Sequence, residues 1–125
     1  MDVFSAFTFE AAHLLPYVPK DHKCARLHGH SYRVEVHVQG SVQPDSGKPN
    51  AGMVVDFADI RSAFQPLRDR LDHYYLNEVE GLENPTSENL ARWIWDRLAG
   101  DLALARVVVR ETCTSGVEYR GPDPS

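Results

Sequence analysis

The chain has few cysteines, no long apolar segment and no excess of basic residues. Two cysteines, Cys24 and Cys113, are too few for a disulfide-stapled scaffold. No apolar run approaches the ~20 residues that a membrane-spanning helix requires. The first residues, MDVFSAFTFE, lack the basic start of a secretory signal. These absences predict a cytoplasmic protein with reduced thiols and no membrane partner.

Acidic residues outnumber basic ones. The chain has 18 Asp and Glu against 13 Lys and Arg, a net charge of −5. Because general nucleic-acid binding relies on a basic field, no nucleic-acid partner is expected. An anionic small molecule would need a local group of cations instead. The stretch PKDHKCAR supplies Lys20, Lys23 and Arg26, although three such residues are also ordinary in a solvated loop.

The apolar content is sufficient for one core of ordinary size. Of the 125 residues, 42% are hydrophobic and 25% are charged, as in globular proteins. A chain of this length can bury roughly two-thirds of its unfolded surface without disulfides. We find no internal repeat, low-complexity tract or linker. The sequence therefore predicts a single domain over residues 1–125.

Hydrophobic periodicity predicts two strands, then two helices, then two strands. Alternation indicates strands in VFSAFTFEAAH and HSYRVEVHVQ. Helical spacing follows Asp56, and again follows Thr86 or Ser87, which are all residue types that favour the helix N-cap. RVVVRETCT and GVEYR indicate a final hairpin. Strands and helices grouped in this way are typical of an α+β fold with an antiparallel sheet.

Three histidines are spaced so that they can share one metal ion. In the motif HGH, His28 and His30 point to the same side of a strand, and alternation places His13 on the apolar face of the preceding strand. An imidazole on such a face needs a partner for its nitrogens. Any one of the three is more often a hydrogen-bonded core histidine, but the set favours zinc, with a fourth position left open. His37 has the opposite parity and is expected at the surface.

Cys24, in the stretch CARLHGH, has three interpretations. Its sulfur can be a fourth ligand that closes a structural zinc site. Its thiolate can instead stand beside the metal as a base or nucleophile. It can also be a small buried hydrophobe, although a loop between charged residues is a poor place for one. Spacing alone leaves ligand and base open.

Two acidic residues stand out further along the chain. Asp72 precedes His73 in LDHYYLN, and the pair can relay protons only if the helix has ended there, because adjacent helical residues do not face each other. A surface pair is the more common case. Glu111 interrupts the apolar strand RVVVRETC, on the face of Val107, Val109 and Cys113, and should have a partner. That partner is an ion pair, a subunit contact or a ligand with paired N–H donors, such as a 2-amino-4-oxo heterocycle.

The motifs FTFEAAH, CARLHGH, LDHYYLN, NPTSENLA and RETCTSG together resemble the 6-pyruvoyltetrahydropterin synthase superfamily, in order from about residue 4 to residue 121. Within it, the sequence is most similar to the bacterial branch that forms 6-carboxy-5,6,7,8-tetrahydropterin for queuosine biosynthesis. The resemblance implies the tunnelling fold, a four-stranded antiparallel sheet with two helices on one face. It also implies a homo-oligomer, in which three sheets join into a barrel and two trimers stack into a hexamer.

The resemblance also implies roles for individual residues. Zinc is held by His13, His28 and His30, and Cys24 is then a catalytic proton-transfer group instead of a ligand. Asp72 and His73 form a catalytic relay that a neighbouring subunit contributes. The substrate-binding residues implied are Glu111, which anchors the pterin, and its pocket neighbours Thr86 and Thr112. On charge and location, we add Lys20, Lys23 and Arg26 as contacts of a triphosphate.

The implied reaction starts from 7,8-dihydroneopterin triphosphate. Elimination releases triphosphate, and a further carbon–carbon cleavage releases acetaldehyde and leaves 6-carboxytetrahydropterin. Zn²⁺ is the expected cofactor, as a Lewis acid. Two alternatives remain open. The enzyme can stop at 6-pyruvoyltetrahydropterin after losing triphosphate, or the chain can be a non-catalytic module that binds zinc or a pterin.

Overall fold

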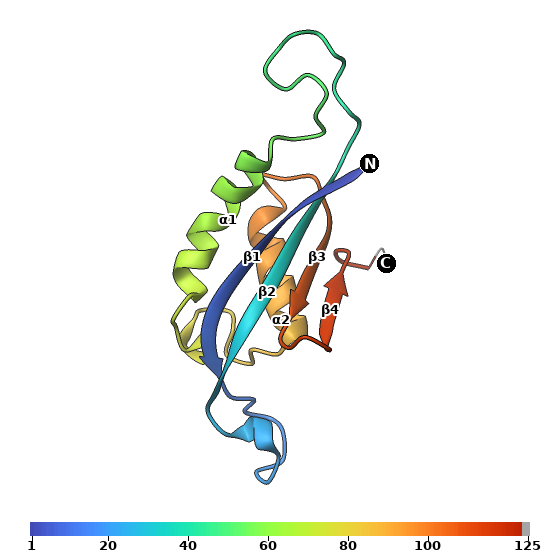
Figure 1. Cartoon of the computed structure of the whole chain (residues 1–125). Helices are drawn as coiled ribbons and strands as arrows, with labels where there is room; N and C mark the ends of the chain where they lie inside the picture. Colours follow the sequence, from blue (N-terminus) through green and yellow to red (C-terminus); the bar gives the residue numbers. More distant parts are fainter. Residues whose placement is uncertain (124–125) are drawn as a thin grey trace.

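The computed structural model describes residues 1–123, and its elements follow the predicted order (Figure 1). The last two residues of the predicted domain lie outside this range. The strands are β1 (Asp2–His13), β2 (His28–Gln39), β3 (Leu104–Arg110) and β4 (Gly116–Tyr119). The α-helices are α1 (Phe57–Leu71) and α2 (Ser87–Leu98), and two short 3-10 helices are η1 (Lys23–Ala25) and η2 (Leu76–Glu78). The α+β prediction is confirmed.

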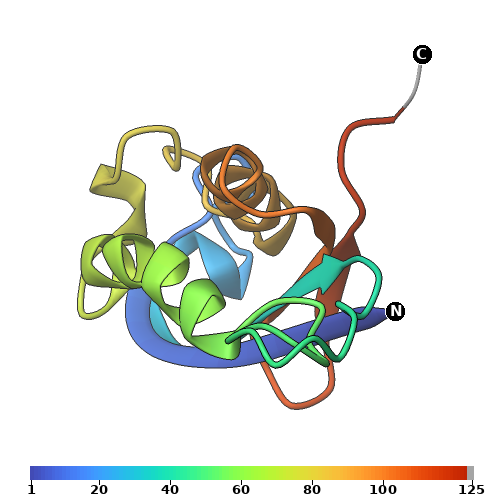
Figure 2. The same ribbon diagram turned by 90° about the horizontal axis from the view of Figure 1, so that it is seen from above.

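The four strands form one antiparallel sheet in the order β1-β2-β3-β4. Both α-helices lie on the same side of it, as the view from above makes plain (Figure 2). The core fills the space between sheet and helices, with Phe9, Val34 and Val109 from the strands and Phe64 and Leu90 from the helices. The predicted sheet with two helices on one face is therefore confirmed.

The pairing of β1 with β2 positions the three histidines. His13 lies opposite His28, and Ala11 lies opposite His30, at the ends of the two strands. Side chains of one parity on β1 face the helices, so Phe9, Ala11 and His13 share the buried side. The predicted faces of both strands are confirmed, and three imidazoles are brought to one end of the core.

Short polar residues set the ends of the helices. The Asp56 carboxylate accepts a hydrogen bond from the Ala58 N–H at the start of α1, and Thr86 accepts one from the Asn89 N–H at the start of α2. Of the two caps that the sequence suggested for α2, Thr86 is the one used. Each cap satisfies one of the free N–H groups of a first turn. Within residues 1–123, no helix is both long and apolar enough to cross a lipid bilayer.

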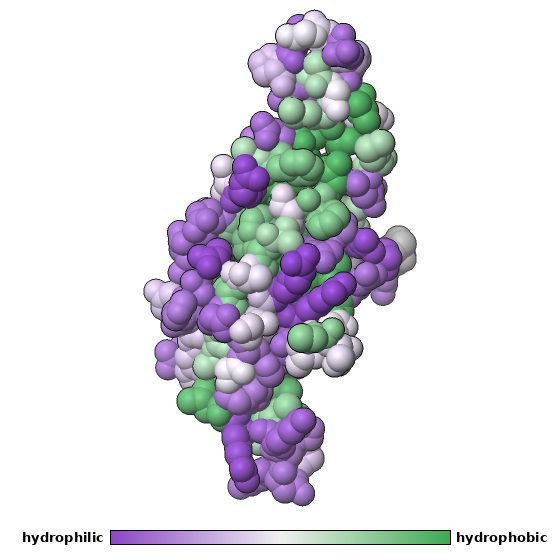
Figure 3. All heavy atoms as spheres, in the orientation of Figure 1, coloured by the Kyte–Doolittle hydropathy of each residue, from purple (hydrophilic) through white to green (hydrophobic). Residues whose placement is uncertain are grey.

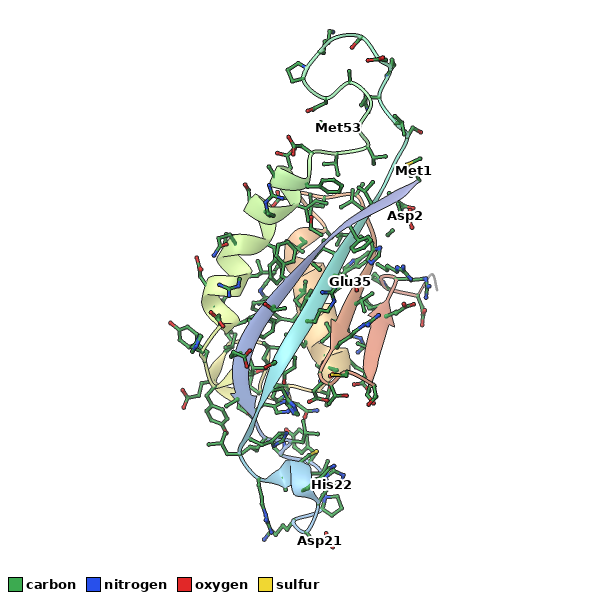
Figure 4. All side chains as sticks on the ribbon, viewed as in Figure 1. Met1, Asp2, Asp21, His22, Glu35 and Met53 are labelled. Atoms are coloured by element: carbon green, nitrogen blue, oxygen red, sulfur yellow. The ribbon has the colours of Figure 1, made fainter. Side chains whose placement is uncertain are left out.

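The face of the sheet away from the helices is mixed in character (Figure 3). His37 lies on this face, as its parity predicts, but the expectation that it is at the surface was wrong, because it is only 4% exposed. Phe4 stacks on its ring at 4.7 Å between centroids, and its Nε2 lies 2.9 Å from Glu35, midway along β2 (Figure 4). A neighbouring aromatic ring thus buries a histidine that strand parity alone places outside.

The Glu35–His37 pair predicts how stability responds to acid. The hydrogen bond from His37, more than the nearby arginines, holds the pKa of Glu35 below its usual value, while burial opposes it. A depressed carboxyl pKa gives stability that is present above the unfolded-state pKa and is lost as pH falls through the folded-state pKa. Glu35→Gln should therefore flatten the loss of unfolding free energy between about pH 5 and pH 3, measured by urea titration. Parallel curves for the variant and the natural chain would contradict this.

Candidate metal centre

The imidazoles of His13, His28 and His30 converge at the end of the β1–β2 pair. Their ring centroids are 4.6, 4.7 and 4.9 Å apart, and the rings stand at steep angles to one another. Each imidazole offers one nitrogen and Glu111 offers one carboxylate oxygen. These four atoms all lie within 4.8 Å of one another. This group of four residues is the candidate metal centre.

Backbone carbonyls select the tautomers of two of these rings. Nδ1 of His13 lies 2.9 Å from the carbonyl oxygen of Pro85, and Nδ1 of His28 lies 2.6 Å from that of Arg26. A carbonyl only accepts, so each Nδ1 carries the proton and donates it. Each Nε2 is then left with a free lone pair. Such a second hydrogen bond is what orients most metal-binding histidines.

The donor set fits a divalent metal ion. Nε2 of His13 and Nε2 of His30 are buried without a hydrogen-bond partner among the described residues, although Oε1 of Glu111 lies 3.0 and 3.1 Å away. Burial also lowers the pKa of His30, which favours the neutral imidazole that a metal ion requires. Buried lone pairs facing a carboxylate need a cation to balance them. Neutral imidazoles and a carboxylate are ligands that zinc accepts.

Cys24 lies in η1, within the loop that joins β1 to β2. Its N–H donates to Nδ1 of His22 at 3.0 Å, and its carbonyl accepts from the Leu15 N–H at 2.7 Å. These bonds fix the backbone beside the histidines while the side chain stays half-buried. Among residues 1–123, the group of potential ligands does not include the Cys24 sulfur. The geometry thus places this thiol outside the set of donors.

His22 is the residue of this loop whose part sequence reasoning missed. Its side chain caps η1 by accepting a hydrogen bond from the Cys24 N–H. Lys20, Lys23 and Arg26 lie in the same loop, which extends from the end of the sheet, with His22 and Asp21 labelled near its tip (Figure 4). None of the three cations forms an ion pair within the described part of the chain.

Asp72 and His73 directly follow the end of α1. Asp72 is the C-cap residue, and His73 adopts the left-handed conformation, with φ at 65°, which few residues other than glycine adopt. Nδ1 of His73 lies 3.0 Å from Asp72, whose carboxylate also accepts from the Glu10 N–H at 3.0 Å. The helix therefore ends where the predicted relay requires.

The His73 ring is directed toward solvent, with 77% of its side chain exposed. It lines a hollow of about 560 Å³ together with Glu10, His30 and Ser31, at the outer edge of β1. His73 does not belong to the metal group within residues 1–123. The Asp72–His73 pair is thus assembled and accessible to solvent, and it lies outside the metal centre.

The segment Pro85–Thr86–Ser87 supports the metal centre from the side of α2. Pro85 fixes His13, and the Ser87 hydroxyl lies 3.4 Å from Oε2 of Glu111. Thr86, which was expected near the ligand, uses its hydroxyl oxygen to cap α2. Ser87, and not Thr86, is therefore the residue of this segment whose hydroxyl lies near Glu111.

Thr112 belongs to the turn between β3 and β4. Its hydroxyl oxygen accepts hydrogen bonds from the Thr114 and Ser115 N–H groups at 3.3 and 3.1 Å. Its role in this chain is to shape the turn that follows Glu111. The Thr112 hydroxyl also lies 3.4 Å from the Thr114 hydroxyl.

The chain is similar to known proteins in both sequence and fold. The family pattern that matches residues 2–122 is described as 6-pyruvoyl tetrahydropterin synthase. A 6-carboxy-5,6,7,8-tetrahydropterin synthase of Synechocystis is 46% identical over 96% of this chain and 93% of its own. A dihydroneopterin monophosphate aldolase of Pyrococcus furiosus is 35% identical over 89% and 90%. The 6-pyruvoyl tetrahydropterin synthase of Caenorhabditis elegans superposes with a TM-score of 0.85 at 28% identity, covering 98% and 96%.

The metal centre predicts a contrast between two histidine variants. His28→Asn removes one of the converging imidazoles, whereas His73→Asn makes the same change outside the group and keeps a residue type that tolerates positive φ. Each variant is loaded with Zn²⁺ and passed through a gel-filtration column. His28→Asn should then contain about tenfold less zinc than the natural chain, or less still, whereas His73→Asn should contain as much zinc as the natural chain. Elemental analysis measures both. Equal zinc retention in His28→Asn would refute the site.

Proposed function

The chain belongs to the 6-pyruvoyl tetrahydropterin synthase family, and from that membership we propose that it is a zinc-dependent 6-carboxy-5,6,7,8-tetrahydropterin synthase. It converts 7,8-dihydroneopterin triphosphate and water to 6-carboxytetrahydropterin, acetaldehyde and triphosphate, for queuosine biosynthesis. The carboxy product is supported by the Synechocystis relative, which carries that name at 46% identity over most of both chains. The observation that carries the proposal is the convergence of three imidazoles beside the Cys24 loop.

Within this proposal, His13, His28 and His30 would hold the zinc, which would supply a Lewis acid for the substrate's side-chain oxygens and so acidify the adjacent C–H. Cys24 accepts that proton as a thiolate. Its position is supported by the two backbone hydrogen bonds that fix η1. The thiol stays outside the ligand set and so remains free to exchange a proton.

Asp72 orients His73 for proton exchange with the substrate's oxygens. With Nδ1 directed at the carboxylate, Nε2 is the nitrogen left to accept and return protons. Glu111 receives the paired N–H donors of the pterin, Thr86 and Thr112 lie at the pocket, and Lys20, Lys23 and Arg26 contact the triphosphate. Loss of triphosphate leaves a pyruvoyl side chain. A water molecule then completes the cleavage that releases its two terminal carbons as acetaldehyde.

We propose that the relay acts in the site of a neighbouring subunit, in a trimer or a hexamer of two trimers. The outward direction of His73 supports this, since 77% of its side chain is exposed. The sheet also ends in two edge strands, β1 and β4, which can pair with other copies of the chain. The shared hollow with His30 offers the competing arrangement, in which His73 acts within its own subunit.

A second reaction is favoured by the Pyrococcus relative, which is named dihydroneopterin monophosphate aldolase. Aldol cleavage would leave the phosphate on the released fragment, so no free triphosphate would form. A 6-pyruvoyltetrahydropterin synthase would release triphosphate without acetaldehyde. Mass spectrometry of the products of zinc-loaded protein with dihydroneopterin triphosphate therefore separates all three, and acetaldehyde with free triphosphate supports our proposal.

The role of Cys24 predicts activity loss without metal loss. Cys24→Ala should lower turnover by about 100-fold or more, as for other positioned proton-transfer groups, while zinc content stays the same. Cys113→Ala is the matched control, because this thiol is exposed in the β3–β4 turn, and it should keep full turnover. Full activity in Cys24→Ala contradicts the catalytic role, and lost zinc would make the thiol a ligand.

The shared site predicts complementation between two inactive variants. If one subunit supplies Cys24 and its neighbour supplies His73, a Cys24→Ala subunit beside a His73→Asn subunit can still form an intact site. The two variants, unfolded and refolded together, should therefore regain part of the activity. Cys24→Ala mixed with His28→Asn is the control, since both lesions fall in the same contribution, and it should regain none. Failure of the first mixture, with mixed oligomers verified by mass spectrometry, would place His73 in its own subunit's site.

A further inference from the structure

Glu111 is directed at the metal centre itself. Its Oε1 lies 3.0 Å from Nε2 of His13 and 3.1 Å from Nε2 of His30, and 28% of its side chain is exposed. The role proposed above for Glu111, anchoring a pterin ring, does not require this direction. If Glu111 only accepted hydrogen bonds from a pterin, nothing would favour its facing the Nε2 lone pairs of the two histidines.

The separations match those between ligands of one ion. Two donors of a tetrahedral zinc site, each about 2.0–2.1 Å from the metal, lie about 3.3 Å apart. The Glu111 contacts at 3.0 and 3.1 Å fall close to this value, and all four donor atoms lie within 4.8 Å of one another. The carboxylate oxygen therefore completes a compact four-donor group.

A metal-free ion pair is a poorer explanation of the same contacts. Donation to Glu111 would require a second proton on the His13 ring, because the Pro85 carbonyl already holds the proton on Nδ1. Instead, Nε2 of His13 and Nε2 of His30 are both buried without such a bond, despite the short distances. Metal-ligand atoms that lie close together without forming hydrogen bonds are expected where their lone pairs all point at one site between them.

The second oxygen of Glu111 is held only weakly. The Ser87 hydroxyl lies 3.4 Å from Oε2, which is long for an O–H···O bond. Glu111 also follows the last residue of β3 and is outside the paired part of the strand. Among residues 1–123, its other polar contacts are those with the two imidazoles, so the Ser87 hydroxyl opposes its rotation only weakly.

We propose that Glu111 occupies the fourth metal position in the pterin-free protein and leaves it when a pterin binds. The inference rests on the zinc site of the proposed function. The ring's paired N–H donors attract the carboxylate away, and the position opens to the substrate's hydroxyl groups. Water is kept from the metal until substrate is present, and one residue couples pterin recognition to exposure of the Lewis acid.

Cobalt-loaded protein tests the first half, because Co²⁺ changes its visible absorption when azide enters an open position. The natural chain should show no azide-dependent change, whereas Glu111→Gln should show one. In the zinc form, the same variant should bind metal at least about tenfold more weakly. Glu35→Gln is the matched control, since it removes a carboxylate from a histidine pair on the opposite face, and it should behave like the natural chain.

The second half is tested on the natural chain with 6-methylpterin, which has the ring but no side-chain hydroxyls. At saturation, followed by pterin fluorescence, it should make the cobalt protein responsive to azide. An azide response without pterin, or none with saturating pterin, overturns the inference even if Glu111→Gln does not fold. Failure of the proposed function is distinct, because it appears as absent turnover by the zinc-loaded protein in the product assay.

Discussion

Two backbone hydrogen bonds make the rest of this site possible. The carbonyls of Pro85 and Arg26 take the Nδ1 protons of His13 and His28, and this turns both Nε2 lone pairs toward the same point. Without those bonds, each ring could rotate or change tautomer, and three neighbouring histidines would be a polar defect at the end of the core. With them, the three imidazoles form a group that can bind a cation, which would offset the cost of burying them.

The fold supplies these constraints from distant parts of the chain. The antiparallel register sets His13 opposite His28, while the Pro85 carbonyl, from the turn before α2, accepts a hydrogen bond from His13 at the end of β1. The 3-10 turn η1 holds Cys24 through bonds to His22 and Leu15. The sheet, the start of α2 and the β1–β2 loop thus all contribute to the site of the three histidines. This explains how motifs far apart in sequence serve one small site.

Strand parity was sufficient to predict the faces of β1 and β2 and the common direction of His13, His28 and His30. It failed for His37, because burial there depends on the stacking of Phe4 from the neighbouring strand, which no single-strand pattern contains. The orientation of Glu111 and the capping by His22 were likewise beyond prediction. Glu111 faces imidazoles that only the folded chain brings near it, and His22 caps η1 only because the loop adopts a 3-10 turn there.

The account as a whole depends on a metal ion between the three imidazoles, with the family's pterin chemistry built around it. The most direct test is a crystal structure of the zinc-loaded protein with diffraction data collected on both sides of the zinc absorption edge. An anomalous peak among the Nε2 atoms of His13, His28 and His30, with the Cys24 sulfur outside the coordination sphere, is the predicted result. A peak bound by the Cys24 sulfur, or no peak among the imidazoles, would contradict it.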